Sequence, residues 1–433
     1  MIGMLLLMLG NGLQGTLLGV RGSLEQIDSA TMGYIMAGYF VGFLGGSKLT
    51  PLMLKRVGHV RVFAALGSLV SAAFILYVAI VNPYAWWLLR VLVGFCFSGL
   101  YVVSESWLNH AASNETRGKA LSLYMIVQMS GMVLGQLLLN AADPAGYNLF
   151  ILITVLVSLS IAPILLSASS SAPVESSAQP MSLRELIRTS PLASVGMVLL
   201  GGIFAVLFAM APVYATLRGL TLPQTSFFLS MIFAGAIAFQ VPVGWLSDKV
   251  DRRFLIIGVS GIGAAMSMVC MYFGDHYSVL IAGAFVLGGT SNPLYSLLVA
   301  YANDYLEHDK MAAAAGGLLF INGCGAMLGP VLVGNLMSRY GIEWFFITLL
   351  LLTSAICLYG IYRMSQRQHV VLEENAPYLP ISYRTSGLGT GYAIDAAEDA
   401  LQDELEEAEE AFEHRPDDAD VLERLNEADR RDK

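Results

Sequence analysis

Residues 244–253 read GWLSDKVDRR and form a short charged loop between two long apolar runs. The run before the loop covers about 224–247, and the run after it covers about 254–273. Each has close to the roughly 20 apolar residues that a membrane-spanning helix needs. The segment therefore predicts two membrane helices joined by a tight turn that carries Asp248, Arg252 and Arg253.

The same alternation of apolar runs and short polar loops extends over most of the 433 residues. Hydrophobic residues make up 56% of the chain and charged residues 13%, about half the charged share of a soluble domain. This composition excludes an ordinary cytosolic enzyme and a disordered chain, and it predicts an all-α membrane protein. Twelve apolar runs lie near 1–19, 30–54, 60–81, 85–108, 119–140, 147–166, 191–214, 224–247, 254–273, 277–300, 312–337 and 343–364. We expect the first run to be a retained span, because no small-residue cleavage site follows it.

A polar gap divides the twelve runs into two groups of six. It begins with a Ser/Ala/Pro-rich stretch that is typical of a linker. Ser182 and Glu185 then have the spacing of a capping box for a short surface helix. We predict an N-terminal six-helix half over 1–166, a cytoplasmic linker over 167–190, a C-terminal six-helix half over 191–364 and an acidic tail over 365–433.

The distribution of basic residues predicts the orientation in the membrane. Short cytoplasmic loops are enriched in Lys and Arg. With both termini inside, the inner loops carry thirteen basic residues and the outer loops carry three, which are Arg21, Arg218 and Arg339. The thirteen are Lys55, Arg56, Arg61, Arg117, Lys119, Arg184, Arg188, Lys249, Arg252, Arg253, Lys310, Arg363 and Arg367. We therefore expect a multi-pass protein of the inner (plasma) membrane with both termini cytoplasmic.

The two halves share residues at a constant offset of 194. The matched pairs are Gly94 and Gly288, Leu100-Tyr101 and Leu294-Tyr295, Asn109 and Asn303, Gly131 and Gly325, and Gly135 and Gly329. The last four glycines form small-xxx-small pairs, which allow close helix packing. Parallel repeats related by an axis along the membrane normal are one architecture for alternating access.

These features resemble the major facilitator superfamily. The loop at 244–253 is similar to its signature Gly-x-Leu-x-Asp-Arg-x-Gly-Arg-Arg, with Asp251 at the inner glycine. The matching loop at 55–61 keeps Gly58 and its basic residues but has Lys55 where the family has Asp. Arg90 with Gly94, and Arg117 with Gly118, match two further family elements. The resemblance covers residues 1–364 and is nearest to a bacterial subgroup with no assigned substrate. It implies twelve helices in two halves related by a pseudo-twofold axis, which rock to move a small solute.

The charged residues at cytoplasmic helix ends are candidates for a gate or for ion coupling. They are Lys55, Arg56, Arg61, Glu105, Arg117, Asp248, Arg252 and Arg253. We expect Asp248 to cap the following helix, to pair with Arg252 or Arg253, and to latch the halves in one state; the alternative is that these charges only set topology. Glu105 has three interpretations, as part of the inner gate, as a proton carrier, or as an ion-pair partner of Arg117 or Arg61.

Polar residues within the spans are candidates for a substrate cavity. They are Asn11, Gln14, Arg90, Tyr101, Tyr124, Gln128, Gln240, Asn292, Tyr295 and Asn322. Arg90 either holds an anionic group or snorkels to the outer surface. Pro293 is expected to interrupt its helix and free backbone groups for a ligand. The alternative for the amides is that they hold helices together. The set is rich in amides and poor in carboxylates, which favours a neutral or anionic organic solute.

The resemblance implies a secondary active transporter, with protons as the expected coupling ion. No Walker A motif, nucleophile elbow or metal-ligand cluster occurs in the sequence. We therefore expect no enzymatic activity, cofactor or metal. The expected partners are a small-molecule substrate and the lipid bilayer, with no nucleic acid. A membrane sensor or scaffold acting through the tail and a lipid flippase stay open as alternatives, as does the direction of transport.

The tail differs in charge from the rest of the chain. Residues 365–433 hold 19 acidic and 7 basic residues, whereas residues 1–364 hold 14 acidic and 17 basic residues. We predict that 365–393 is turn-rich, that a helix covers about 395–413, and that a second short helix reaches about 429. The tail is either solvated or docks on the basic inner loops or on an unknown partner.

Overall fold

The computed structural model describes residues 1–111, 114–165, 181–366, 385, 389–394 and 396–397, and these form helices and their connecting turns. The N-terminal half comprises α1 (Ile2–Leu24), α2 (Ser29–Val57), α3 (His59–Ala79), α4 (Pro83–Ala111), α5 (Asn114–Leu137), the 3₁₀ turn η1 (Leu138–Ala141) and α6 (Asn148–Leu165). The short α7 (Leu183–Thr189) follows, with Ser182 Oγ accepting a hydrogen bond from Glu185 N over 3.1 Å. The predicted N-terminal cap of this helix is therefore confirmed.

The C-terminal half repeats the pattern of long helices. It comprises α8 (Pro191–Ala205), the π-helical turn η2 (Val206–Met210), α9 (Ala211–Leu217), α10 (Leu222–Ser247), α11 (Arg252–Phe273), α12 (Tyr277–Asn303), α13 (His308–Tyr340) and α14 (Trp344–Met364). In the tail, residues 389–394 are helical, which corrects the expectation of a turn-rich stretch there. Of the helix predicted over about 395–413, only residues 396–397 are described, and they are helical. The second predicted helix, which reaches about 429, lies outside the described residues.

Nine helical segments of the described chain have the length and hydropathy to cross a membrane. The segment Pro191–Leu217, which joins α8, η2 and α9, is one of them. Three helices fall outside this group, although each occupies a predicted span. α6 is shorter, and α2 and α12 are diluted by glycine and polar residues. The glycines of α2 and α12 have a structural role, because they pack against the backbones of α4 and α10.

The glycines matched by the sequence repeat have matched packing roles. A Cβ added at Gly94 would overlap Tyr39 O of α2, and one added at Gly288 would overlap Ile232 O of α10. A Cβ at Gly135 would lie 2.9 Å from Gly12 Cα, and one at Gly329 would lie 3.0 Å from Gly202 Cα. The α2–α4 and α1–α5 contacts of the first half thus recur as α10–α12 and α8–α13 in the second.

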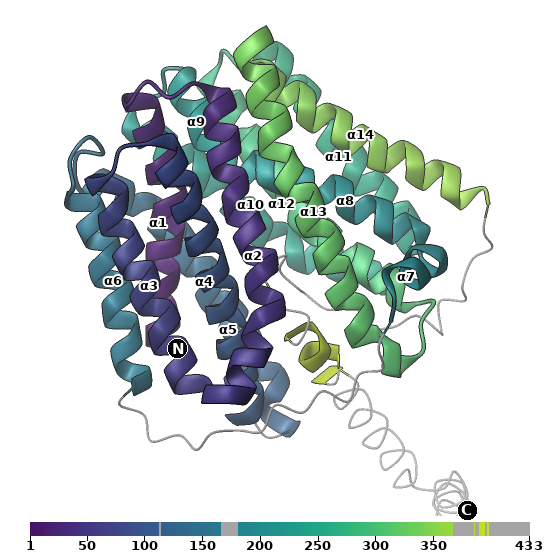
Figure 1. Ribbon diagram of the computed structural model, residues 1–433. Helices are drawn as coiled ribbons and strands as arrows, with labels where there is room; N and C mark the ends of the chain where they lie inside the picture. The colour runs from purple at the N-terminus through teal and green to yellow at the C-terminus, as the bar shows by residue number, and fades with distance from the viewer. Residues whose placement is uncertain (112–113, 166–180, 367–384, 386–388, 395, 398–433) are drawn as a thin grey trace, which may run out of the picture.

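The two halves meet at the end of the bundle where α1 ends and α2 begins, which we call the Ser29 end. In Figure 1, α2 and α13 lie side by side at this end and diverge toward the other. Ser29 Oγ donates to Gly334 O over 3.1 Å, and Ser226 Oγ of α10 donates to Gln136 O over 2.6 Å. The opposite end, which holds the C-terminal part of α4, we call the Glu105 end.

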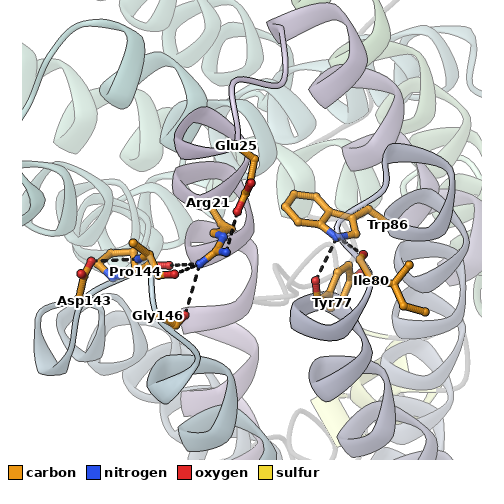
Figure 2. Close-up of polar contacts among 9 residues, drawn as sticks. Arg21, Glu25, Tyr77, Ile80, Trp86, Asp143, Pro144 and Gly146 are labelled. Carbon is orange, nitrogen blue, oxygen red and sulfur yellow. Dashed lines mark hydrogen bonds and ion pairs between the residues drawn. The ribbon is translucent and has the colours of Figure 1, made fainter.

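Polar contacts fasten the turns of the N-terminal half at the Ser29 end (Figure 2). Arg21 of α1 donates to Pro144 O over 3.2 Å and pairs with Glu25 at 2.6 Å. Trp86 Nε1 donates to Tyr77 O at 3.1 Å and Ile80 O at 3.0 Å, which closes the turn between α3 and α4. These contacts hold the turns at the Ser29 end of this half to the helices beside them.

Candidate functional site

A chain of hydrogen bonds connects α4 to α1 inside the N-terminal half. Asn11 Nδ2 donates to Tyr101 OH over 2.6 Å, and Gln14 Nε2 donates to Asn11 Oδ1 over 3.1 Å. Arg90 Nη1 then donates to Gln14 Oε1 over 2.7 Å. Asn11 and Gln14 share a face of α1 because residues three apart lie on one side of a helix. Four predicted cavity residues are thus brought together in one buried network.

The Arg90 guanidinium ends this network inside the bundle. The residue is 3% exposed, so it does not snorkel to the surface. Its other partners are Met36 Sδ at 3.2 Å and the ring of Tyr39, whose centroid lies 5.0 Å from Arg90 Cζ. Arg90 Nε has no hydrogen-bond partner among the described residues. No described carboxylate pairs with this arginine, and an unpaired buried charge is costly.

Arg90 lines a cavity of about 50 Å³ between the two halves. Its walls come from α1, α2, α4 and α5 on one side and from η2 and α10 on the other. The lining residues are Asn11, Gly12, Gln14, Gly15, Thr16, Tyr39, Phe40, Arg90, Met132, Gln136, Leu207, Phe208, Ala209, Leu229, Ile232 and Phe233. Ligand pockets usually measure about 300–1,000 Å³, so the halves must separate further to admit a solute.

The helix irregularity lies in η2 and not at Pro293. α12 continues through Pro293 as one helix from Tyr277 to Asn303, so the predicted interruption there is wrong. Ser291 Oγ bonds Leu287 O at 2.6 Å, and hydroxyls of this kind help a helix tolerate proline. The π-helical turn comes just before Pro212, whose missing N–H and bulky ring disturb the preceding turn. π-Helical turns are frequent at functional sites.

The π-helical turn η2 and helix α10 together present an aromatic surface that sequence reasoning missed. The rings of Phe208 and Phe233 lie 4.9 Å apart at 33°, on the cavity side contributed by the C-terminal half. Tyr39 faces them from the N-terminal half. Pro212 within an apolar run was the available signal for this site.

The predicted amides of the C-terminal half hold helices together. Asn292 Nδ2 donates to Gln240 Oε1 over 3.0 Å, and Gln240 Nε2 donates to Ser296 Oγ over 3.1 Å. Asn322 Nδ2 donates to Met197 O over 3.1 Å. The fourth candidate of this half, Tyr295, is buried against Phe204 at 6.3 Å between ring centroids. These residues do not line the Arg90 cavity.

Three further candidates cluster toward the Glu105 end. Tyr124 OH donates to Glu105 Oε1 over 3.5 Å, and Glu105 is only 1% exposed. Gln128 lies one turn from Tyr124 on α5 and is also 1% exposed. Neither polar atom of the Gln128 amide has a hydrogen-bond partner among the described residues. A buried acid and an unpaired amide thus lie deeper in the bundle than the charged loops.

The charged loop at 244–253 differs from the prediction in which aspartate caps the following helix. Asp251, not Asp248, caps α11, with its side chain accepting from Arg253 N over 2.9 Å. Asp251 also pairs with Arg253 at 2.7 Å. Arg252 pairs with Asp304 at the end of α12 and donates to Ala300 O over 3.2 Å. Asp248 is the exposed C-cap residue of α10. Asp251 is well placed to cap because it immediately precedes the first helical residue.

The basic residues of the matching first-half loop lie on the surface. Lys55, Arg56 and Arg61 are exposed, and Gly58 joins α2 to α3 with a φ of 82°, a conformation that favours glycine. Arg61 forms no ion pair within the described chain, so its proposed pairing with Glu105 is not found. Arg117 lies in α5, but its side chain is outside the described residues.

We expect Asp304→Ala to destabilise the C-terminal half by about 3–5 kcal/mol, because it removes a carboxylate that pairs with the buried charge of Arg252. The two side chains are 2% and 6% exposed. Thermal unfolding of the purified protein measures the loss. Glu307→Ala is the matched control, since Glu307 is 77% exposed and should change the stability little. Equal unfolding temperatures for the two variants would contradict the prediction.

The apolar helices and the cavity between the two halves fit a multi-pass membrane transporter. The family model of the Major Facilitator Superfamily matches residues 1–237 and 219–385, and the chain belongs to this family. It is therefore a transporter of a small molecule and not an enzyme.

Relatives and solved structures agree with this assignment. The chain is 27% identical over 348 residues to "Uncharacterized MFS-type transporter YcaD" of Escherichia fergusonii, covering 80% of this chain and 90% of that protein. It is 25% identical over 346 residues to the protein of the same name from Escherichia coli O7:K1, with the same coverage. The crystal structure of the nucleoside transporter NupG matches with a TM-score of 0.66 at 14% identity, covering 84% of this chain and 98% of that one. A single-residue NupG variant matches with a TM-score of 0.68, also at 14% identity. These structures support the fold alone.

Proposed function

We propose that this protein is a secondary active transporter of a small organic solute that carries an anionic group, and that Arg90 binds this group. The observation that carries the proposal is the buried Arg90 guanidinium without a carboxylate partner in the described chain. Arginine presents a planar fork of donors that matches a carboxylate or phosphate. In this proposal the substrate supplies the missing negative charge.

The surroundings of Arg90 suit such a solute. Gln14 holds one guanidinium nitrogen at 2.7 Å, and the ring of Tyr39 lies beside the charge. Phe208 and Phe233 supply an apolar surface across the cavity for the organic part of the molecule. A cavity with a few fixed polar groups and apolar walls is the usual form of a small-molecule site.

Alternating access follows from where the cavity lies. It is bounded by both halves, so a rocking motion changes the side from which Arg90 can be reached.

We propose that all twelve long helical segments, including α2, α6 and α12, cross the inner membrane. The basic-residue bias assigns the Glu105 end and both termini to the cytoplasm. In this orientation the Ser29 end is the closed external side.

A ligand-stability screen tests the substrate class. Purified full-length protein is heated with pooled organic anions, with uncharged amides of the same molecules, and with nucleosides. A ligand at 100 times its dissociation constant adds about 2.7 kcal/mol of stability. The proposal expects the anions to stabilise the protein and their amides not to. Stabilisation by uncharged solutes or cations alone would refute it, and any hit proceeds to flux measurements in proteoliposomes.

Proton coupling is proposed through Glu105, a carboxylate buried within the bundle. We expect Glu105→Gln to retain substrate binding but to lose most of its pH-gradient-driven flux, because an amide has no carboxyl proton to take up and release. Counterflow without a pH gradient should be less affected, because it needs no net proton movement. Loss of binding in this variant, with an intact conformational cycle, would contradict the assignment.

A further inference from the structure

A short segment of the C-terminal tail lies between the two halves at the Glu105 end. It comprises Thr385, the helical residues 389–394, and residues 396–397, and we call it the tail segment. In Figure 1 its short yellow helix lies between the lower ends of the two halves, beside the lower part of α13. The segment is far from the last membrane helix in sequence, since α14 ends at Met364.

The tail segment contacts both halves closely. Gly389 lies against the Glu105 carboxylate of α4, where an added Cβ would be 2.6 Å from Glu105 Cδ. Gly391 lies against α13, where an added Cβ would be 3.0 Å from Ala312 Cβ. Both positions suit glycine because there is little space for a larger side chain. The segment therefore bridges the halves through specific contacts.

Several side chains of the tail segment are buried, as expected for a segment that is docked on the helices. Thr390 is 2% exposed, Ile394 5% and Ala396 8%, in a tail that composition alone would place in solvent. Glu105 beneath it is 1% exposed. The segment thus covers the buried acid that the proposed transport cycle uses.

The position of the segment matters because the halves are closed at the other end. Ser29 with Gly334, and Gly33 with Pro330, join α2 to α13 at the Ser29 end. A rocking cycle must next bring the halves together at the Glu105 end. The geometry points to an autoinhibitory plug: the tail segment wedges between the halves, covers Glu105 and holds the transporter in this one state. This inference rests on the proposed transport function.

The docked segment also has a feature suited to release. Thr385 Oγ1 is buried without a hydrogen-bond partner among the described residues. A buried hydroxyl that has lost water and gained no hydrogen bond is unfavourable, which weakens docking. Because the segment is tethered to the chain, even weak docking is maintained by a high local concentration. The plug is therefore reversible, and its release activates transport.

A reversible cross-link tests the plug in the full-length protein. In a background without the four native cysteines, Gly391→Cys and Ala312→Cys are combined and the protein is reconstituted in proteoliposomes. Disulfides form when Cβ atoms lie about 3.5–4.5 Å apart, which a small adjustment of the 3.0 Å separation satisfies. We expect a disulfide under mild oxidation, and flux at least about tenfold lower in the oxidised than in the reduced protein, because transport scales with the unplugged fraction. Each single-cysteine variant, oxidised in the same way, is the control.

Two outcomes would overturn the inference. Failure of the pair to cross-link means that the segment does not dock at α13. Cross-linking with unchanged flux means that docking does not inhibit. Absence of flux in both redox states refutes the proposed transport function instead, and docking is then judged by the labelling experiment below.

Labelling of Ala312→Cys provides that independent readout. Gly389→Leu places a side chain against the Glu105 carboxylate and should expel the segment, so that a maleimide reacts faster at position 312. Ala393→Leu adds the same bulk at a partly exposed position of the same helix and should keep the protection. Equal labelling rates in the two variants would show that position 312 is not covered by the segment.

Discussion

Arg90→Gln is expected to lower the affinity for an anionic solute by about 30-fold to several thousand-fold, since loss of one partner of a buried charge pair costs about 2–5 kcal/mol. Glutamine keeps a polar group near Gln14 but cannot balance a carboxylate or phosphate. Ligand-dependent thermal shifts and proteoliposome flux measure the loss. Arg90→Lys should give an intermediate result, because lysine keeps the charge without the planar fork.

Stability without ligand separates a binding role from a structural one. A buried charge without a partner is unfavourable, so Arg90→Gln should unfold at the same temperature as the unsubstituted protein or above it. Arg339→Gln, at an exposed position on α13, is the matched control and should change neither binding nor stability. A clear drop in the unfolding temperature of ligand-free Arg90→Gln would identify the arginine as a structural residue.

Gly33→Leu is expected to disfavour closure of the Ser29 end and to slow transport. A Cβ at Gly33 would overlap Pro330 O and lie 3.3 Å from Gly334 Cα, so the backbones of α2 and α13 must move apart. Overpacking of this kind costs about 1–3 kcal/mol. A cost of this size shifts the closed population by about 5- to 150-fold. Each half should still fold, because the clash lies between the halves and not within either one.

Cysteine labelling at position 29 detects this shift. Ser29 is 6% exposed and bonded to Gly334 O, so a cysteine there is protected while the end is closed. In a background without native cysteines, Gly33→Leu should increase its reaction with an impermeant maleimide. Gly258→Leu is the control, since an added Cβ there meets nothing within 4 Å. Unchanged labelling at position 29 would show that the halves do not part at this contact.

The sequence was a good guide to features that depend on neighbouring residues. Long apolar runs predicted the helices, and the spacing of Asn11 and Gln14 predicted a shared face. The glycines at the 194-residue offset predicted close packing, and the structure shows Gly94 and Gly288 against equivalent backbone atoms. The Pro293 interruption failed because Ser291 and its surroundings support a continuous helix.

The tertiary structure decided which polar groups became partners. Arg90 and Gln14 are 76 residues apart in the chain, and Asn322 and Met197 are 125 apart. No local pattern distinguishes an amide that holds two helices together from one that faces a cavity, because the difference lies in what the packing of distant helices places beside it. The same holds for the tail segment, whose burial depends on Glu105 and Ala312 from opposite halves.

Composition and periodicity determined that the chain forms membrane helices in two similar halves, since hydrophobic burial and backbone hydrogen bonding act locally along each span. The position of the Arg90 cavity depends on how the two halves associate. The contacts of the tail segment at the Glu105 end depend on the same association.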